Sequence, residues 1–251
     1  MDGITRLLPD VDFFIFMYMR KDAASSSQIE GTNATMIDSI EAESQTSDKL
    51  PDDVDDILHY LKAMNYGFDR LATLPLGLRF IKELHSELLE GTRTTHFADP
   101  GNFRKSQNWI GGTRPDNASF VPPPPHEIMR CLDDLEKFLR ADNNLLPVIK
   151  AGLVHSQFET IHPLLDGNGR TGRLLITFQL HMENLLEKPV LFLSWFFKKH
   201  KEVYYQRLRE YHSKGNVERW LDFFLDGITE VAQEAIDTVY EITKLRETDM
   251  T

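Results

Sequence analysis

The chain has 251 residues, of which 41% are hydrophobic and 27% are charged, so it can bury a full core as one large domain or two small ones. Its formal net charge of -11 argues against a general affinity for nucleic acid, because that affinity depends on clustered Lys and Arg. The single cysteine, Cys131, excludes an internal disulfide and a cysteine-rich metal cage and favours a reducing, cytoplasmic location.

The first apolar run of the chain covers residues 13–19. It is too short to span a bilayer, and Asp10 and Asp12 precede it where a signal peptide would carry positive charge. We therefore expect a buried helix segment here and no membrane partner for the chain. The polar residues 41–56 are expected to form a surface connection between an N-terminal helical section and the remainder.

The rest of the chain has mostly helical periodicity. Apolar residues recur at intervals of three and four over residues 128–139 and 217–231, which predicts two amphipathic helices. The apolar stretches 148–158 and 174–186 predict two more helices inside a bundle. The best strand candidate is the segment 103–125, which contains a Gly-Gly pair and a Pro-Asp turn signal. The sequence thus predicts an all-α fold with one short β-hairpin.

The stretch "HPLLDGNGRTGR", residues 162–173, gathers several groups that can act on a phosphate. Its glycines permit backbone angles that let successive N–H groups converge on an anion. A helix is expected to begin there, and its unpaired N–H groups and dipole favour the same anion. Arg170 and Arg173 share a face at the start of that helix, so both can reach the far phosphates of a nucleotide.

Two further groups in this stretch complete a set suited to phosphoryl chemistry. Asp166 offers a hard oxygen ligand and suits Mg²⁺ held by one carboxylate together with phosphate oxygens. His162, four residues earlier, is the expected proton acceptor near neutral pH. A base for an incoming hydroxyl, a metal ion and a fixed electrostatic clamp together predict transfer of a phosphate-containing group.

Other phosphate-binding and metal-binding interpretations fit this chain less well. No P-loop pattern occurs, and an EF-hand is disfavoured because Arg170 and Thr177 stand where its loop needs oxygen ligands. Glu159 and His162 form a Glu-x-x-His pair, the unit of four-helix di-iron sites, but a second such pair is missing from the sequence. Glu159 is instead expected to support the helix of the histidine or to face solvent.

The stretch 162–173 closely resembles the signature of Fic-domain proteins, with Leu164 where phenylalanine is usual. The segments "GNFRKSQNWIGG" and "FVPPPP" resemble the substrate-positioning hairpin, or flap, of that family, and the similarity covers about residues 80–186. The resemblance implies a Fic-type helical bundle with a short β-hairpin flap over the active site. It also implies an N-terminal section, residues 1–56, and a Fic catalytic region, residues 57–251, that ends in C-terminal helices.

The activity that the resemblance implies is that of a protein adenylyltransferase. His162 would take the proton of a Ser, Thr or Tyr hydroxyl on a target protein, and the hydroxyl would attack the α-phosphate of Mg-ATP. Asp166 would hold Mg²⁺. The residues implied to bind the nucleotide phosphates are Gly167, Asn168, Gly169, Arg170 and Arg173. The flap residues that would offer backbone edges to the target are Trp109, Ile110 and Gly111. Tyr204 and Tyr205 fall where relatives line the adenine pocket, although tyrosines in an amphipathic helix are just as often core residues.

The stretch "SSSQIEGTNAT", residues 25–35, has two interpretations. Ser27 and Glu30 have the spacing of a capping box, with Gly31 as a helix stop. The pattern Ser26-x-x-x-Glu30-Gly31 also resembles the inhibitory-helix motif of the Fic family, here expected at about residues 22–31. In that motif the glutamate pairs with the second signature arginine, Arg173. Such a carboxylate would compete with the γ-phosphate, so the resemblance implies autoinhibition by Glu30.

Some questions stay open at the level of sequence. A Fic-fold enzyme that removes AMP or transfers another phosphate-containing group, and a non-catalytic regulatory binding module, are the alternatives. ATP is the expected partner, while the target protein, self-modification and a homodimer are undecided. The start "MDGITRLLPD" is short for proteins of this arrangement, and no basic recognition helix follows Lys244. We therefore expect a shortened chain or a short family member.

Overall fold

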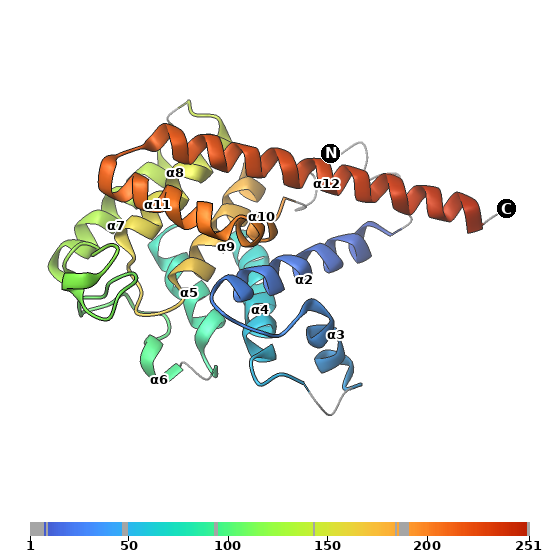
Figure 1. Ribbon diagram of the computed structural model, residues 1–251, viewed down its shortest axis with the longest axis horizontal. Helices are drawn as coiled ribbons and strands as arrows, with labels where there is room; N and C mark the ends of the chain where they lie inside the picture. The colour runs from blue at the N-terminus through green and yellow to red at the C-terminus, as the bar shows by residue number, and fades with distance from the viewer. Residues whose placement is uncertain are drawn as a thin grey trace.

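The computed structural model describes residues 8, 10–46, 50–92, 95–142, 144–183, 185 and 191–249. Within these residues the chain is a bundle of helices (Figure 1). The helices are α2 (Val11–Ile29), α3 (Met36–Ser44), α4 (Val54–Leu71), α5 (Leu78–Leu89), α6 (Thr95–Ala98), α7 (Pro125–Arg140), α8 (Pro147–Ile161), α9 (Asn168–Met182), α10 (Ser194–Lys199), α11 (Lys201–Lys214) and α12 (Val217–Asp249), with a 3-10 turn η1 (Pro115–Asn117). The predicted all-α class is confirmed.

The predicted β-hairpin is reduced to one pair of residues in this structure. Ile110 and Phe120 form an isolated antiparallel bridge, and the described part of the chain contains no strand. The Ile110 N–H donates to the Phe120 carbonyl at 2.9 Å, and the Phe120 N–H donates back at 3.2 Å. The proline run that follows starts α7, because the fixed φ of proline suits the first helical positions.

Residues 41–56 are less exposed than the polar composition predicts. α3 continues to Ser44, α4 already begins at Val54, and the side chains of Asp53 and Asp56 are buried. These two side chains can be buried because their carboxylates accept hydrogen bonds from the turn after α2. Asp53 accepts the backbone N–H groups of Asn33 and Ala34 at 2.6 and 3.0 Å. The expected surface connection thus holds for the exposed residues 43–46 and fails at residues 53–56, where three of the four side chains are buried.

α2 is only partly buried along the apolar run at residues 13–19. Phe14 and Tyr18 are buried, whereas Phe13 and Phe16 are 60% and 43% exposed. The first half of α2 therefore packs on the body through one face, whereas the second half, from residue 20 to residue 29, is almost wholly buried. None of the helices in the described ranges is both long enough and apolar enough to span a membrane.

The core surrounds α8 and α9, which lie side by side (Figure 1). Gly67 of α4 allows close contact with α9, since a Cβ at this glycine would lie 2.1 Å from the Phe178 ring. A second apolar cluster is rich in aromatic rings and joins α8 to α10, α11 and α12. Within it, the buried Trp220 donates its Nε1–H to the Gly152 carbonyl at 2.7 Å. The two clusters hold α8, which ends at His162, on both sides.

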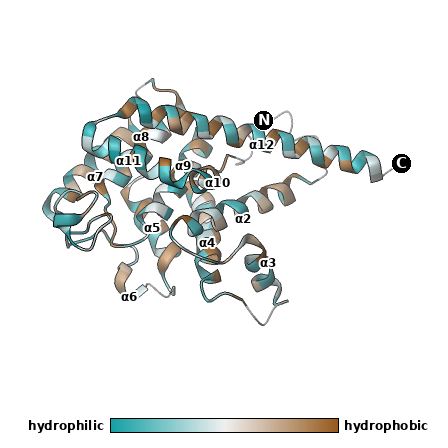
Figure 2. Ribbon diagram, in the orientation of Figure 1, coloured by the Kyte–Doolittle hydropathy of each residue, from teal (hydrophilic) through white to brown (hydrophobic). Residues whose placement is uncertain are grey.

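α12 runs along α8, α10 and α11, and its C-terminal half continues past them beside α2 (Figure 1). Its hydropathy alternates along its length, with apolar residues recurring between polar ones (Figure 2). The Tyr18 hydroxyl of α2 donates to Thr238 at 3.0 Å, and Lys21 pairs with Glu234. α2 is therefore fixed to α12 along the same stretch that leads to Glu30.

Candidate active site

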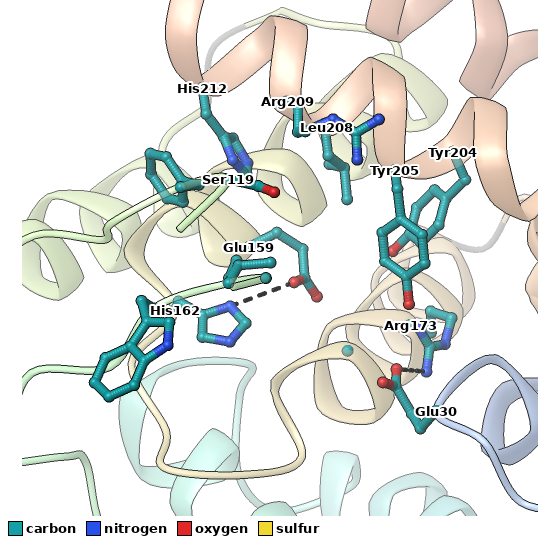
Figure 3. A pocket seen from close by; sticks show the side chains of 15 residues that line it. Glu30, Ser119, Glu159, His162, Arg173, Tyr204, Tyr205, Leu208, Arg209 and His212 are labelled. Carbon is teal, nitrogen blue, oxygen red and sulfur yellow. Dashed lines mark hydrogen bonds and ion pairs between the residues drawn. The ribbon is translucent and has the colours of Figure 1, made fainter. Parts of the chain in front are cut away.

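A pocket of about 430 Å³ lies between α8, α9, α11, the turn after α2 and the segment that carries Ile110 and Phe120 (Figure 3). The predicted site residues that line it are Glu30, Trp109, Ile110, Gly111, His162, Gly169, Arg173, Tyr204 and Tyr205. The predicted site residues that do not line it are Ser26, Gly31, Asp166, Gly167, Asn168 and Arg170. Residues far apart in sequence thus meet at one cavity, which holds the candidate base His162 and the signature arginine Arg173.

His162 ends α8 in a left-handed backbone conformation, with φ of 48°. Such a conformation is costly for a residue with a Cβ and persists when neighbouring contacts fix it. Here the Arg104 Nε–H donates to the His162 carbonyl at 2.8 Å, and the Asn108 side-chain amide donates to it at 3.3 Å. The backbone of His162 is therefore held by side chains from the segment before η1.

Arg104 is only 3% exposed and distributes its remaining donors over nearby carbonyls. Its Nη1 donates to Ser106 at 2.9 Å and its Nη2 to Pro123 at 2.6 Å. One guanidinium thus joins both ends of the segment over the pocket to the end of α8. The role of Arg104 could not be predicted from the sequence, because its partners are backbone carbonyls and these leave no pattern of side chains.

Replacing Arg104 with methionine is expected to lower the free energy of unfolding by about 2 kcal/mol, since buried carbonyls lose charged donors. Urea unfolding at neutral pH measures the change. Lys105→Met is the matched control, because Lys105 is exposed, and its unfolding free energy should stay close to that of the parent. Equal stability of the two variants would contradict the anchoring role of Arg104.

The loop before α9 is closed by its own side chains. The Asn168 Oδ1 accepts the Leu164 N–H at 2.9 Å, and its Nδ2 donates to the Leu164 carbonyl at 2.8 Å. Gly167 has φ of 76°, a conformation that glycine adopts without strain. The N-terminus of α9 has no side-chain cap, so its first N–H groups remain available to an anion beside Gly169.

His85 supports this loop from below and was not predicted from the sequence. It is completely buried, its Nδ1 accepts the Gly101 N–H at 3.0 Å, and its Nε2 lies 3.1 Å from the Asp166 carbonyl. Because Nδ1 is an acceptor, Nε2 carries the hydrogen and donates it. Burial lowers the pKa of His85 to about 4, so the ring is neutral at pH 7.

The two signature arginines have different surroundings. Arg170 is buried, with Nη1 3.8 Å from Asp56 of α4 and Nη2 3.5 Å from Asp166. Arg173 faces the pocket and its Nη2 donates to the Glu30 carboxylate at 2.6 Å (Figure 3). Of the pair expected at the phosphates, Arg173 is the one that lines the pocket in this structure.

The contact between Glu30 and Arg173 is built by α2 and α9 together. The Arg173 Nε donates to the Ser26 hydroxyl at 2.8 Å and its Nη2 donates to the Ser26 carbonyl at 3.1 Å, so the guanidinium is fixed along the last turn of α2. The side chain of Arg173 is 2% exposed and that of Glu30 is 36% exposed. A Cβ on Gly169 would lie 2.2 Å from the Glu30 carboxylate, so this glycine makes room for it.

The turn after Glu30 is well anchored. α2 ends at Ile29, Glu30 caps it, and Gly31 has φ of 102°, so the helix stop predicted at Gly31 is confirmed. The Ser27 capping box was wrong, because α2 continues through Ser27, whose hydroxyl donates to the Asp56 carbonyl at 3.2 Å. This hydrogen bond to the backbone of α4 helps to fix the position from which Glu30 enters the pocket.

Replacing Gly31 with alanine is expected to lower the free energy of unfolding by about 1 kcal/mol, because a Cβ is strained at this positive φ. No heavy atom lies within 4 Å of the added Cβ, so the effect is conformational and not steric. Thermal unfolding of the variant beside Gly31→Asn tests it. Asparagine tolerates the left-handed region better and should lose less stability than alanine.

α11 supplies the wall of the pocket opposite α9. Tyr204 is 1% exposed and its hydroxyl lies 2.9 Å from the His155 Nε2, so its phenol belongs to the core more than to the pocket. Burial, and then the nearby Glu30 carboxylate, raise the pKa of Tyr205. His212 packs against Phe120 with ring centroids 4.3 Å apart. This ring contact holds the segment over the pocket against α11.

His212 is expected to make the fold less stable as the pH falls from about 6.5 to about 4. Burial lowers the pKa of His212 from 6.5 to about 4 in the folded chain, so between these values the unfolded chain binds a proton that the folded chain does not. Urea unfolding at several pH values measures the slope. His212→Gln should reduce the slope and leave the part that comes from His85, whereas His126→Gln, at a side chain 77% exposed, should leave the slope as it is in the parent.

Comparison with known proteins shows which family this chain resembles in sequence. Sequence profiles described as Fic/DOC family and Fic/DOC family N-terminal match residues 75–180 and 1–69. Protein adenylyltransferase Fic of Drosophila grimshawi is 33% identical over 157 residues, which are 59% of this chain and 30% of that protein. The chain therefore matches about a third of the length of this curated relative.

Solved structures share the fold over nearly the whole chain. A Fic family protein from Desulfovibrio desulfuricans has a TM-score of 0.78 at 21% identity, covering 95% of this chain and 69% of that one. A Fic domain containing signaling protein from Bacteroides thetaiotaomicron has a TM-score of 0.73 at 19% identity, covering 96% and 92%. The two profile matches place the chain in the Fic/DOC family, and these solved structures share its fold.

Proposed function

We propose that this chain is a protein adenylyltransferase that transfers AMP from Mg-ATP to a Ser, Thr or Tyr hydroxyl of a target protein or of itself, and that Glu30 restrains it. The observation that carries the proposal is the Glu30–Arg173 ion pair, at 2.6 Å, inside the pocket that His162 lines. In this proposal residues 1–56 hold the inhibitory helix and residues 57–251 form the catalytic region.

The proposed reaction uses a few groups of the pocket. His162 accepts the proton of the target hydroxyl while the hydroxyl oxygen bonds to the α-phosphorus, and the bond to pyrophosphate breaks. The first N–H groups of α9, at Asn168 and Gly169, stabilise the charge on the phosphate oxygens. Arg173 holds the far phosphates. Because its Nη2 now binds Glu30, the carboxylate and the nucleotide compete for one guanidinium.

The residues around Asp166 fit a magnesium ion that is shared with phosphate. Its side chain is 41% exposed, and Oδ1 already accepts the Gly167 N–H at 2.7 Å. The described residues contain no group of three or more His, Cys, Asp or Glu side chains that could hold a metal by themselves. Asp166 would therefore be one ligand beside phosphate oxygens. Bound there, Mg²⁺ would neutralise charge on the phosphates.

The segment 109–120 is proposed to act as the flap that positions the target. The Ile110 N–H donates to the Phe120 carbonyl, and the Ile110 carbonyl accepts the N–H groups of Ser119 and Phe120. In an extended segment the backbone groups next to a paired residue point the other way, so Trp109 would present its own to a target peptide. Gly111, with φ of 69°, turns the chain directly after Ile110. Main-chain contacts of this kind read little sequence, which suits targets that differ in their side chains.

Labelled ATP tests which group is transferred. Glu30→Gly is incubated with Mg²⁺ and a cell lysate, in parallel with ATP labelled at the α-phosphate or at the γ-phosphate. Protein that carries the α-label alone supports AMP transfer. Protein that carries the γ-label would replace the proposal with phosphoryl transfer. Loss of α-label from pre-labelled protein, with no new labelling, would indicate an enzyme that removes AMP.

A further inference from the structure

Glu159 is a buried carboxylate in the pocket that the proposed reaction does not use. It lies one helical turn before His162 on α8, on the face that also carries His155. Its side chain is 7% exposed, and Oε2 lies 3.7 Å from the Nδ1 of His162 (Figure 3). Oε1 has no hydrogen-bond partner within the described part of the chain. The imidazole of His162 is therefore the polar group that this carboxylate contacts most directly.

The neighbouring helix leaves space for this carboxylate. A Cβ on Gly172 of α9 would lie 2.7 Å from the Glu159 Oε1, so a larger residue there would push Glu159 away. A buried carboxylate is costly unless positive charge lies near it. Burial by itself would raise the pKa of Glu159, but the contact with His162 and the charges of His155 and Arg173 bring that pKa below its ordinary value.

The ring of His162 is fixed less firmly than its backbone. Arg104 and Asn108 hold the backbone carbonyl through hydrogen bonds. For the ring, the polar contact recorded among the described residues is the one with Glu159, and Nδ1 has no hydrogen-bond partner at shorter distance. A gap of 3.7 Å is just beyond hydrogen-bond length, and contacts of this kind tighten when a substrate binds.

We propose that Glu159 is the positioning residue for His162: its carboxylate accepts the Nδ1–H and so leaves the lone pair of Nε2 for the target hydroxyl. The inference rests on the proposed function. When the hydroxyl proton moves to Nε2 and the oxygen bonds to phosphorus, the ring becomes an imidazolium beside a carboxylate. Glu159 then has two effects: it selects the tautomer and it stabilises the new positive charge. The carboxylate of a Ser-His-Asp triad acts on its histidine in the same two ways.

Other titratable and charged groups lie around the same pocket and also act on the ring of His162. They are His155 on α8, Arg173 on α9, His212 and Arg209 on α11, and Glu30 from the turn after α2. Glu159 is the carboxylate with a recorded contact to the ring, whereas the carboxylate of Glu30 is paired with Arg173. Loss of Glu159 would therefore leave the imidazole without a carboxylate beside it, in a pocket that also holds the guanidinium groups of Arg173 and Arg209.

The tautomer of His162 can be measured without any transfer activity. Chains with ¹⁵N-labelled histidine are compared by NMR, and the signal of His162 is identified by its absence from His162→Asn. We expect the neutral ring of the parent to carry its hydrogen on Nδ1. Glu159→Leu should move the hydrogen to Nε2. Glu159→Gln keeps an acceptor and should retain Nδ1–H.

An exposed glutamate on the wall helix provides the control. Glu202 of α11 is exposed, and Glu202→Gln should leave the tautomer of His162 unchanged. An Nε2–H tautomer in the parent, or one that does not respond to Glu159→Leu, would overturn the proposal. Because this readout needs no ATP, its failure is distinct from a failure of AMP transfer itself.

Kinetics in the Glu30→Gly background give a second readout. Glu159→Leu should lower kcat for AMP transfer about a hundredfold while the Kd for ATP stays the same, because the carboxylate acts on the base and not on the nucleotide. Glu159→Asp should recover part of the rate. An equal loss in ATP affinity and in rate would assign Glu159 a structural role and reject the positioning role.

Discussion

Glu30→Gly is expected to transfer AMP about ten to a hundred times faster than the parent chain. The charge-assisted hydrogen bond from Arg173 to Glu30 is 2.6 Å long, and such bonds contribute about 1.5–3 kcal/mol. Each 1.4 kcal/mol corresponds to about a tenfold change. Removing the carboxylate frees the guanidinium for the far phosphates, so ATP can adopt the pose in which its α-phosphate faces His162.

The rate is measured as transfer of α-label to protein at fixed ATP and Mg²⁺. Glu30→Gln should lie between the parent and Glu30→Gly, since the amide fills the same space without the charge. Glu43→Gly is the matched control because Glu43 pairs with Arg20 at the other side of α2 and does not enter the pocket. Activation of Glu43→Gly to the same degree would point to general loosening of α2 and not to release of Arg173.

The sequence could predict the pairing of Glu30 with Arg173 only through the family resemblance. These residues are 143 positions apart, and periodicity carries no information on contacts at that separation. What periodicity did predict is the helical class, because the apolar spacing of α7 and α12 depends on one face of each helix. The signature stretch was also predictable as a loop followed by a helix start, since its glycines stand between two apolar runs.

Hydrogen bonds between side chains and the backbone could not be predicted from the sequence. Arg104 and His85 bind the carbonyls of His162 and Asp166, and a carbonyl looks the same in every sequence. Asp53 and Asp56 were expected at the surface because aspartate is usually solvated, yet they accept N–H and O–H donors of the turn after α2. Such roles depend on where loops meet, and tertiary packing decides that.

The burial of Glu159 could not be predicted from the sequence either. The sequence displayed it as half of a Glu-x-x-His pair, a pattern suited to a metal site or to a solvated helix face. Its carboxylate is instead enclosed, because the glycine at position 172 on the adjacent helix leaves room for it. Spacing along α8 could place Glu159 beside His162, but only the neighbour on α9 determines whether the carboxylate is buried.

His162→Ala, in the Glu30→Gly background, is expected to reduce AMP transfer about 10²- to 10⁴-fold, the usual contribution of a positioned general base. ATP binding should be nearly unchanged, because the guanidinium of Arg173 and the first N–H groups of α9 remain. Transfer of α-label and calorimetric ATP titration are measured on the same preparation, with His126→Ala as the exposed control. Full transfer by His162→Ala would mean that the hydroxyl loses its proton to another group and would reject His162 as the base.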